Sequence, residues 1–256
     1  MMTNYYYGHP EKEGSYESLL SVFSAHESLN SAQTSSLPLV QFWRDDADLD
    51  RRVSAIVREI SGLDIGAAEK RFEYATSLPP KSGRGKASMT DLMILSDCWR
   101  VAIEAKYTEY TKDPAYRPTV DEWMHERRDD KYVKNREKVL NGWHSLIGSH
   151  CGTIPHSVPY QFIHRVASAC CCEGKQRPAL VYHLFYDDDR SAADAFSNRL
   201  KGWAEDIGLR DIRFVVAKTR VVPPVDVPKD LSELFVQMNS ERPYGDMAKT
   251  EVDVII

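Results

Sequence analysis

Helical spacing of apolar residues is clearest in the segment 45–61. The apolar positions there recur three and four residues apart and share one face of a helix: Leu49, Val53, Ile56, Val57 and Ile60. Acidic residues crowd the first turn, where the helix dipole favours them, and Gly62 follows the last turn. The first 40 residues show only weak helical spacing around Leu19 and Leu20. We therefore expect a helix over 45–61, preceded by a peripheral helix and loop.

Three β-forming segments follow this helix, at 70–76, 89–95 and 100–108. A basic loop with two glycines, 79–86, separates the first two strands. The polar segment 121–147 carries apolar residues at wide intervals and predicts one long helix or two broken ones. The remaining expected elements are a helix over 159–172, a buried strand over 179–186, a helix over 191–207, a strand over 212–217 and a helix over 231–238.

This order of elements predicts an α/β fold, with α+β character, in which helices flank one mixed sheet. The early strands would be joined by short turns and the later strands by crossovers. No linker divides the chain and no repeat at solenoid periods is present, so we expect a single domain over 1–256. Within it we expect a peripheral extension (1–40), a core (45–217) and a C-terminal helix and tail (218–256). The apolar tail, 252–256, is typical of an edge strand or of a contact between copies.

Composition narrows the class of protein. The chain has 256 residues, 42% of them hydrophobic, and its 33 Lys+Arg against 38 Asp+Glu give a net charge of −5. No apolar run approaches the roughly 18 residues of a membrane helix, and the N-terminus lacks a charged and then apolar leader. The five cysteines form no C-x-x-C pair. We expect a soluble cytoplasmic protein. Its acidic net charge argues against nonspecific coating of nucleic acid, but it does not exclude local basic patches or carboxylates that bind a metal.

Charged residues interrupt the two apolar strands that meet at the turn 96–97. Glu104 and Lys106 are two residues apart, so on a strand they share a face. With a two-residue loop, Asp91 opposes Ala102 and lies diagonal to Glu104, at about 7–8 Å between backbones. A three-residue loop would turn Asp91 to the other face unless a bulge corrects the register.

Two carboxylates that converge on one point repel each other unless a cation lies between them. Oxygen ligands of this kind suit Mg²⁺ or Mn²⁺ rather than zinc. A nearby ammonium can orient a water on such an ion and offset the charge that builds on a phosphate. The combination of metal, water and lysine is what hydrolysis of a phosphodiester requires.

The pattern Asp91…Glu104-Ala105-Lys106 resembles the D…(D/E)-x-K signature of the PD-(D/E)XK nuclease superfamily, which has the restriction-endonuclease-like fold. The resemblance implies an αβββαβ core, and the expected elements between 45 and 186 match that order. It also implies that Asp91 and Glu104 bind a divalent metal with help from the Ala105 carbonyl. Lys106 would then serve the attacking water.

The resemblance extends to two further positions. Some members of the superfamily add a glutamate from the first core helix, and Glu59 is the candidate here. Exonuclease-like branches carry a Gln on the helix after the motif strands and a Tyr four residues later. Gln161 fits the first position, whereas Arg165 stands in the second. Thr90 replaces the Pro that names the superfamily, as other residues do in many members.

The bare pattern also occurs at Glu173-Gly174-Lys175 and at Asp129-Asp130-Lys131. The first of these follows a run of cysteines beside a glycine, and the second lies in a polar helical stretch. Only Glu104 lies in an apolar strand whose hairpin partner carries its own Asp. Context therefore favours the Glu104 match.

The basic residues have two interpretations each. Lys81, Arg84 and Lys86 in the loop before Asp91 would either grip a DNA backbone or form a solvated turn. The alternating charges of 127–138 are typical of a helix that carries its own ion pairs.

These observations predict a metal-dependent DNA endonuclease that uses Mg²⁺ or Mn²⁺. A nuclease for RNA or branched DNA is an alternative. The rival from another class is a non-catalytic nucleic-acid-binding or assembly protein that keeps the fold. In that protein Glu104 and Lys106 would form a salt bridge on a solvated sheet face. A homodimer would explain double-strand cutting, and we expect no membrane partner.

Overall fold

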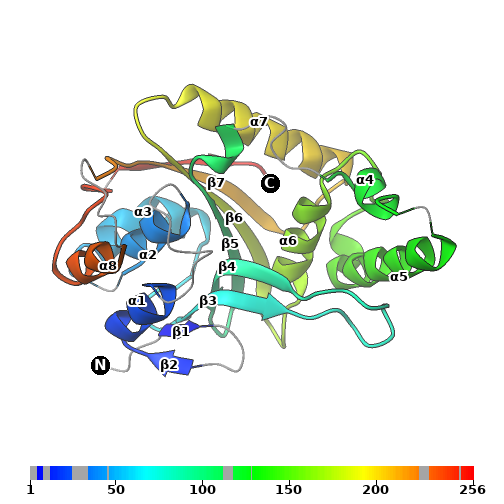
Figure 1. Cartoon of the computed structure of the whole chain (residues 1–256), viewed down its shortest axis with the longest axis horizontal. Helices are drawn as coiled ribbons and strands as arrows, with labels where there is room; N and C mark the ends of the chain where they lie inside the picture. Colours follow the sequence, from blue (N-terminus) through cyan, green and yellow to red (C-terminus); the bar gives the residue numbers. More distant parts are fainter. Residues whose placement is uncertain are drawn as a thin grey trace.

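The computed structural model describes residues 5–7, 12–24, 34–44, 46–111, 118–127, 129–224, 231–247 and 249–256. A mixed sheet with the order β2-β1-β3-β4-β5-β6-β7-β8 runs through this part of the chain, with helices on both faces (Figure 1). The strands are β1 Tyr5–Tyr7, β2 Lys12–Gly14, β3 Glu69–Thr76, β4 Ser88–Leu95, β5 Trp99–Lys106, β6 Arg177–Tyr186, β7 Arg213–Arg220 and β8 Thr250–Val254. The α-helices are α1 Tyr16–Ser24, α2 Ser36–Phe42, α3 Leu49–Glu59, α4 Val120–Met124, α5 Asp130–Ile147, α6 Tyr160–Cys170, α7 Ser191–Asp206 and α8 Leu231–Ser240.

Strand direction in the sheet follows from how the strands are connected. β3, β4 and β5 pair antiparallel, joined by the loop 77–87 and by a short turn after Leu95. β5, β6 and β7 pair parallel because α6 and α7 carry the chain back between them. β8 closes one edge by pairing antiparallel with β7, which places the apolar tail in an edge strand. The predicted mixed α/β architecture is therefore confirmed.

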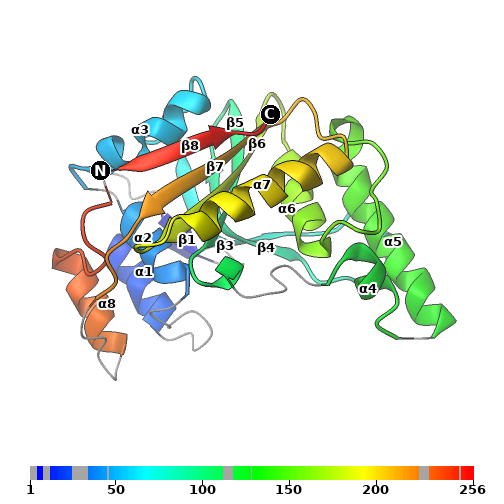
Figure 2. The same ribbon diagram turned by 90° about the horizontal axis from the view of Figure 1, so that it is seen from above.

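Helices lie on both faces of the sheet (Figures 1 and 2). The sheet separates two hydrophobic clusters, one on each face. One face packs against α1, α2, α3 and α8. The opposite face packs against α4, α5, α6 and α7. The alternation along β5 shows this division, because Ile103 and Ala105 join the first cluster and Ala102 joins the second. Glu104 and Lys106 have the parity of Ala102, so they belong to the α6 face.

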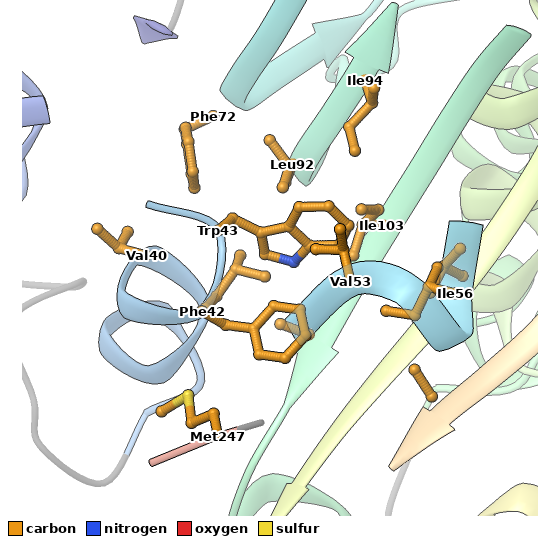
Figure 3. Close-up of a cluster of buried hydrophobic side chains, with 14 of the residues drawn as sticks. Val40, Phe42, Trp43, Val53, Ile56, Phe72, Leu92, Ile94, Ile103 and Met247 are labelled. Carbon is orange, nitrogen blue, oxygen red and sulfur yellow. The ribbon is translucent and has the colours of Figure 1, made fainter. Parts of the chain in front are cut away.

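Helix α2 lies in the core, which contradicts part of the prediction that residues 1–40 are peripheral. Leu37, Leu39 and Val40 are at most 1% exposed, and the following Phe42 and Trp43 pack under the sheet (Figure 3). No helical period marks this segment, because the helix has seven residues and six of them are buried. A helix that is buried on all sides has no polar face, so its apolar positions show no helical period.

The structure shortens one predicted helix, and it confirms the second of the two alternatives predicted for 121–147. The predicted helix over 45–61 is shorter at both ends, since α3 runs from Leu49 to Glu59. Its start is later because Asp46 and Asp48 are drawn into hydrogen bonds before α3 begins. Asp46 accepts from Arg52 at 2.9 Å and from the Asp48 backbone N–H at 3.0 Å. The segment 121–147 forms two helices, and Asp129 caps the second by accepting from the backbone of Lys131 at 2.7 Å. None of the described helices has the length and apolar character needed to cross a bilayer.

Replacing Phe42 with alanine tests the placement of α2. The ring is fully buried, so Phe42→Ala should lower the free energy of unfolding by about 3–5 kcal/mol in urea titrations. Val236→Ala on α8 is the matched control, because Val236 is 68% exposed and should change stability by less than about 0.5 kcal/mol. Equal effects of the two substitutions would contradict a core position for α2.

Candidate functional site

The hairpin between β4 and β5 is longer than predicted. Leu95 pairs with Arg100, and the turn 96–99 is closed by a hydrogen bond from the Ser96 N–H to the Trp99 carbonyl at 3.0 Å. The predicted pairing of Asp91 with Ala102 is therefore wrong by two residues. A shift of two preserves the faces of a strand, so Asp91 still shares a face with Glu104.

Asp91 lies where β4 and β5 stop pairing. The last paired residues are Leu92 and Ile103, and the register would next bring Asp91 level with Glu104. The Asp91 carboxylate instead accepts a hydrogen bond from the Ala105 N–H at 2.8 Å. Because β4 and β5 separate here, the Ala105 N–H has no carbonyl partner on β4, and the Asp91 carboxylate takes the place of that partner. Asp91 is thus fixed beside the Glu104-Ala105-Lys106 segment.

Glu104 is the centre of the site. Its side chain is fully buried, and three side chains donate to it. Lys106 Nζ lies 2.7 Å from Oε1, and Gln161 Nε2 lies 3.1 Å from the same oxygen. Arg165 Nε binds Oε2, and Arg165 Nη2 lies 3.4 Å from Oε1. Because Gln161 and Arg165 are one turn apart on α6, both reach the same carboxylate.

Arg165 is itself held in place from β4. Its Nη1 donates to Ser88 Oγ at 2.8 Å, and Ser88 Oγ lies 2.9 Å from His164 Nδ1. Burial, followed by the charges of Arg165 and Lys106, places the pKa of His164 well below its ordinary value. The imidazole is therefore neutral, and its Nδ1 can accept the Ser88 hydroxyl proton. This chain of contacts fixes the Arg165 guanidinium.

Glu73 on β3 is a third carboxylate of the cluster. Its neighbours Phe72 and Tyr74 pair with Leu92 and Thr90, so Glu73 stands opposite Asp91. The ladder is interrupted at Glu73, which has a φ of +49°. Such a value is uncommon outside glycine and is found more often at functional sites. The broken ladder concentrates a third acidic group at one point of the sheet.

The electrostatics divide the three carboxylates into two kinds. Burial acts to raise the pKa of Glu104, but Arg165 and Lys106 hold it below its ordinary value. Burial and the charge of Glu104 instead raise the pKa of Asp91 to about 7. Burial and the charge of Asp91 raise the pKa of Glu73 to about 8. Glu104 is a paired anion, whereas Asp91 and Glu73 share more negative charge than the site neutralises.

Lys106 is a cation in this setting. Burial acts to lower its pKa, but Glu104 and Asp91 outweigh that effect and raise it above the ordinary value. A lysine of this kind donates hydrogen bonds and does not accept a proton near neutral pH. It can orient a water or a phosphate oxygen.

The donor chemistry of the cluster fits a hard divalent cation, because three carboxylates face two cationic side chains. Excess negative charge is what such an ion would remove. Among the described residues, no three Asp, Glu, His or Cys side chains are already placed to ligate one ion together. Glu104 in particular has both oxygens engaged by Arg165. Metal binding would require Glu104 to exchange part of this ion pair.

The structure brings Asp91, Glu104, Ala105, Lys106 and Gln161 together, as predicted, but not Glu59. Glu59 ends α3 on the opposite face of the sheet, where its carboxylate binds Arg213 at 2.9 Å. The sequence prediction used the acidic first turn and the apolar spacing of this helix. Neither shows which side of the sheet the helix packs against. The prediction for Glu59 is therefore wrong.

Lys81, Arg84 and Lys86 lie on the exposed β3–β4 loop. Arg84 and Lys86 line a pocket of about 410 Å³ whose wall includes Ser88, His164 and Arg165. The loop therefore leads directly to the residues that hold Glu104.

Sequence reasoning missed Glu73 and did not place Arg165 beside Glu104. Glu73 lies in a strand without a motif, and only the β3–β4 register brings it opposite Asp91. Arg165 was noted as a departure from the expected Tyr. Its spacing of four from Gln161 was the signal that it would face the same carboxylate.

The comparisons with known proteins give one match. The sequence profile of the family described as Domain of unknown function (DUF6946) covers residues 14–223. The chain belongs to the DUF6946 family. No curated protein and no solved structure matches it. The DUF6946 region contains Glu73, Asp91, Glu104, Lys106 and Arg165, whereas β8 lies outside it.

The raised pKa of Asp91 predicts a pH-dependent stability in the metal-free DUF6946 protein. The folded state keeps a proton on Asp91 between its ordinary pKa of 3.8 and about 7, whereas the unfolded state releases it. The stability that this proton contributes is present below about pH 4 and is lost as the pH rises through about 7. Asp91→Asn should therefore gain in Tm relative to wild type between these limits.

The measurement is thermal melting in EDTA at acidic and at slightly alkaline pH. Asp97→Asn in the exposed turn is the control and should show the same Tm difference from wild type at both values. A difference for Asp91→Asn that does not change with pH would contradict the raised pKa.

Proposed function

We propose that this chain is a divalent-metal-dependent phosphodiesterase that hydrolyses DNA at the Asp91–Glu104–Lys106 cluster. The observation that carries the proposal is the meeting of these side chains where β4 and β5 separate, with Asp91 hydrogen-bonded to the Ala105 N–H at 2.8 Å. Mg²⁺ and Mn²⁺ are the cations whose ligand preferences suit carboxylates.

Topology lends support to a restriction-endonuclease-like core. The elements α3, β3, β4, β5, α6 and β6 follow the expected αβββαβ sequence, with α4 and α5 inserted between β5 and α6. The strands of this segment are adjacent in the sheet, with β6 parallel to β5. The motif residues all lie on the face that α6 covers. We propose that this segment is the nuclease-like core.

Asp91 and Glu104, with the Ala105 carbonyl, would hold the cation. When bound, the cation would supply Lewis acidity toward a phosphoryl oxygen and would lower the pKa of a water. Lys106 would donate to the attacking water or to a phosphate oxygen, because its ammonium stays charged. Gln161 would keep Glu104 oriented through its hydrogen bond at 3.1 Å.

Arg165 suits the role of a phosphate ligand. It contacts Glu104 from one side and borders the pocket of the β3–β4 loop on the other. A guanidinium matches the oxygens of a phosphate in a bidentate arrangement. In that position the guanidinium would offset the charge that develops on the phosphoryl oxygens.

One observation favours the non-catalytic alternative. Arg165 closes a buried ion pair on Glu104, and this pair already neutralises the carboxylate that a metal would need. A protein that binds nucleic acid and has no hydrolytic activity would keep such a pair permanently. The two functions differ in whether a divalent cation competes with Arg165.

DNA cleavage tests the catalytic function. Wild type should cut supercoiled plasmid or single-stranded DNA only when Mg²⁺ or Mn²⁺ is present. Lys106→Ala should lose at least about 100-fold in rate, because the donor to the developing charge is removed. Arg165 still neutralises Glu104 in this variant, so the fold should persist, as circular dichroism would show.

Lys175→Ala is the control, because Lys175 is an exposed lysine beyond α6. Cleavage that is equal in wild type and Lys106→Ala would place the activity elsewhere. Absence of cleavage in both would favour the binding protein.

Thermal melting with Mn²⁺ tests cation binding without reference to activity. A cation that binds only the folded state raises Tm, and a concentration 100 times Kd adds about 2.7 kcal/mol. We expect this increase in wild type and its loss in Asp91→Asn. An unchanged Tm in wild type would mean that Arg165 keeps Glu104 and that the site does not bind the cation.

A further inference from the structure

A basic groove lies between the β3–β4 loop and α5. It has a volume of about 1030 Å³, and six cationic side chains line it: Lys81, Arg84, Arg127, Lys131, Lys134 and Lys138. Asp129 and Asp130 are the two acidic residues of its lining. The groove therefore carries an excess of four positive charges on a chain whose net charge is −5. Positive charge that is concentrated in one groove of a negatively charged chain indicates a polyanion as the ligand.

The walls of the groove are fixed to each other. The Asn135 side chain accepts from the Arg84 N–H at 2.8 Å and donates to the Arg84 carbonyl at 3.1 Å. Gly142 lets the loop approach α5, because a Cβ there would meet Ser82 at 2.5 Å. In Figure 1 the β3–β4 connection extends beside α5. The groove is a built feature of two elements and not a chance gap beside a free loop.

The lysines on the α5 wall are not used by the fold. Among the described ion pairs, none involves Lys131, Lys134 or Lys138, and all three side chains are exposed. The prediction of a helix that carries its own ion pairs is not confirmed, because Arg136 binds Glu126, which precedes α5, at 2.7 Å. Three like charges on one exposed helix cost folding energy unless a ligand neutralises them.

The groove continues toward the carboxylate cluster. Arg84, Tyr132 and Asn135 line both the groove and the 410 Å³ pocket. That pocket ends on Ser88 and Arg165, which hold Glu104. A chain of phosphates lying in the groove would therefore be directed at the site.

The lining of the groove itself offers charge without a surface on which bases could stack, and in the adjoining pocket the rings of Trp123 and Tyr160 are stacked on each other, 3.8 Å between centroids. Its one aromatic residue is Tyr132, and the guanidinium groups of Arg127 and Arg136 lie over that ring, 5.3 and 4.4 Å from its centroid. Proteins that bind single strands without sequence preference use aromatic platforms for the bases, whereas contacts to a duplex backbone need only cations.

We infer that this groove binds the phosphate backbone of duplex DNA, independently of sequence, and directs it to the Asp91–Glu104–Lys106 site. The inference rests on the proposed function for the choice of DNA as the substrate. The groove residues contact only the backbone, so they position the duplex and do not read its bases.

Salt dependence of DNA binding tests the inference in the absence of divalent metal. In EDTA, the affinity for a labelled duplex of about 20 base pairs is measured by anisotropy from about 50 to about 200 mM salt. For wild type, log K should fall steeply with log salt. The triple variant Lys131→Gln/Lys134→Gln/Lys138→Gln should give a slope shallower by about 3, because each phosphate contact contributes about one unit.

The matched control is Lys175→Gln/Lys201→Gln/Lys249→Gln, which removes the same charge from exposed lysines outside the groove lining. It should keep the wild-type slope. An unchanged slope in the α5 variant, an equal loss in the control, or no duplex binding by wild type would overturn the inference. Tighter binding of the single strand than of the duplex would overturn the choice of duplex.

Binding and cleavage fail separately in this design. Lys106→Ala should lose cleavage, and its slope should become shallower by no more than about 1, against about 3 for the α5 variant, because Lys106 is a single cation outside the groove lining. A DNA-binding groove with no cleavage by wild type would refute the nuclease and leave the groove standing. Cleavage with an unaltered slope in the α5 variant would refute the groove and leave the nuclease standing.

Discussion

A carboxylate that is removed from water must be neutralised where it lies, and Glu104 imposes this requirement on three elements of the fold. β5 supplies Lys106 two residues away, and α6 supplies Gln161 and Arg165. β4 supplies Ser88, which holds the guanidinium of Arg165 at 2.8 Å. Removing one partner from a buried ion pair leaves an uncompensated charge and is more costly than never having formed the pair. The packing of α6 on β4 and β5 is thus tied to the charge at one position.

The same constraint explains why the acidic residues gather where the sheet opens. Glu73 interrupts the β3 ladder, and Asp91 lies just beyond the last β4–β5 pair. A continuous ladder would have spaced these side chains regularly on a flat surface. Local loss of pairing instead lets them converge, while the Ala105 N–H is still satisfied by Asp91. The irregular part of the sheet therefore coincides with the cluster of acidic side chains.

The sequence predicted what depends on local periodicity. The order of elements, the mixed sheet and the shared face of Asp91, Glu104 and Lys106 follow from alternation and spacing. The turn length was wrong, yet the faces survived because the error was an even number of residues. What could not be predicted depends on contacts between distant segments. The side of the sheet chosen by α3 decides the position of Glu59, and the β3–β4 register decides that of Glu73.

Asn135 adds a consequence for the β3–β4 loop. By bonding both the N–H and the carbonyl of Arg84, its amide imitates the partner residue of a β-ladder. A loop held in this way has already lost most of its backbone freedom before any ligand arrives. Side chains that must be immobilised on binding cost about 0.5–1.5 kcal/mol each, and a preordered backbone adds little to that cost. The backbone of this exposed loop is therefore preorganised, and it holds the basic side chains in place before a ligand binds.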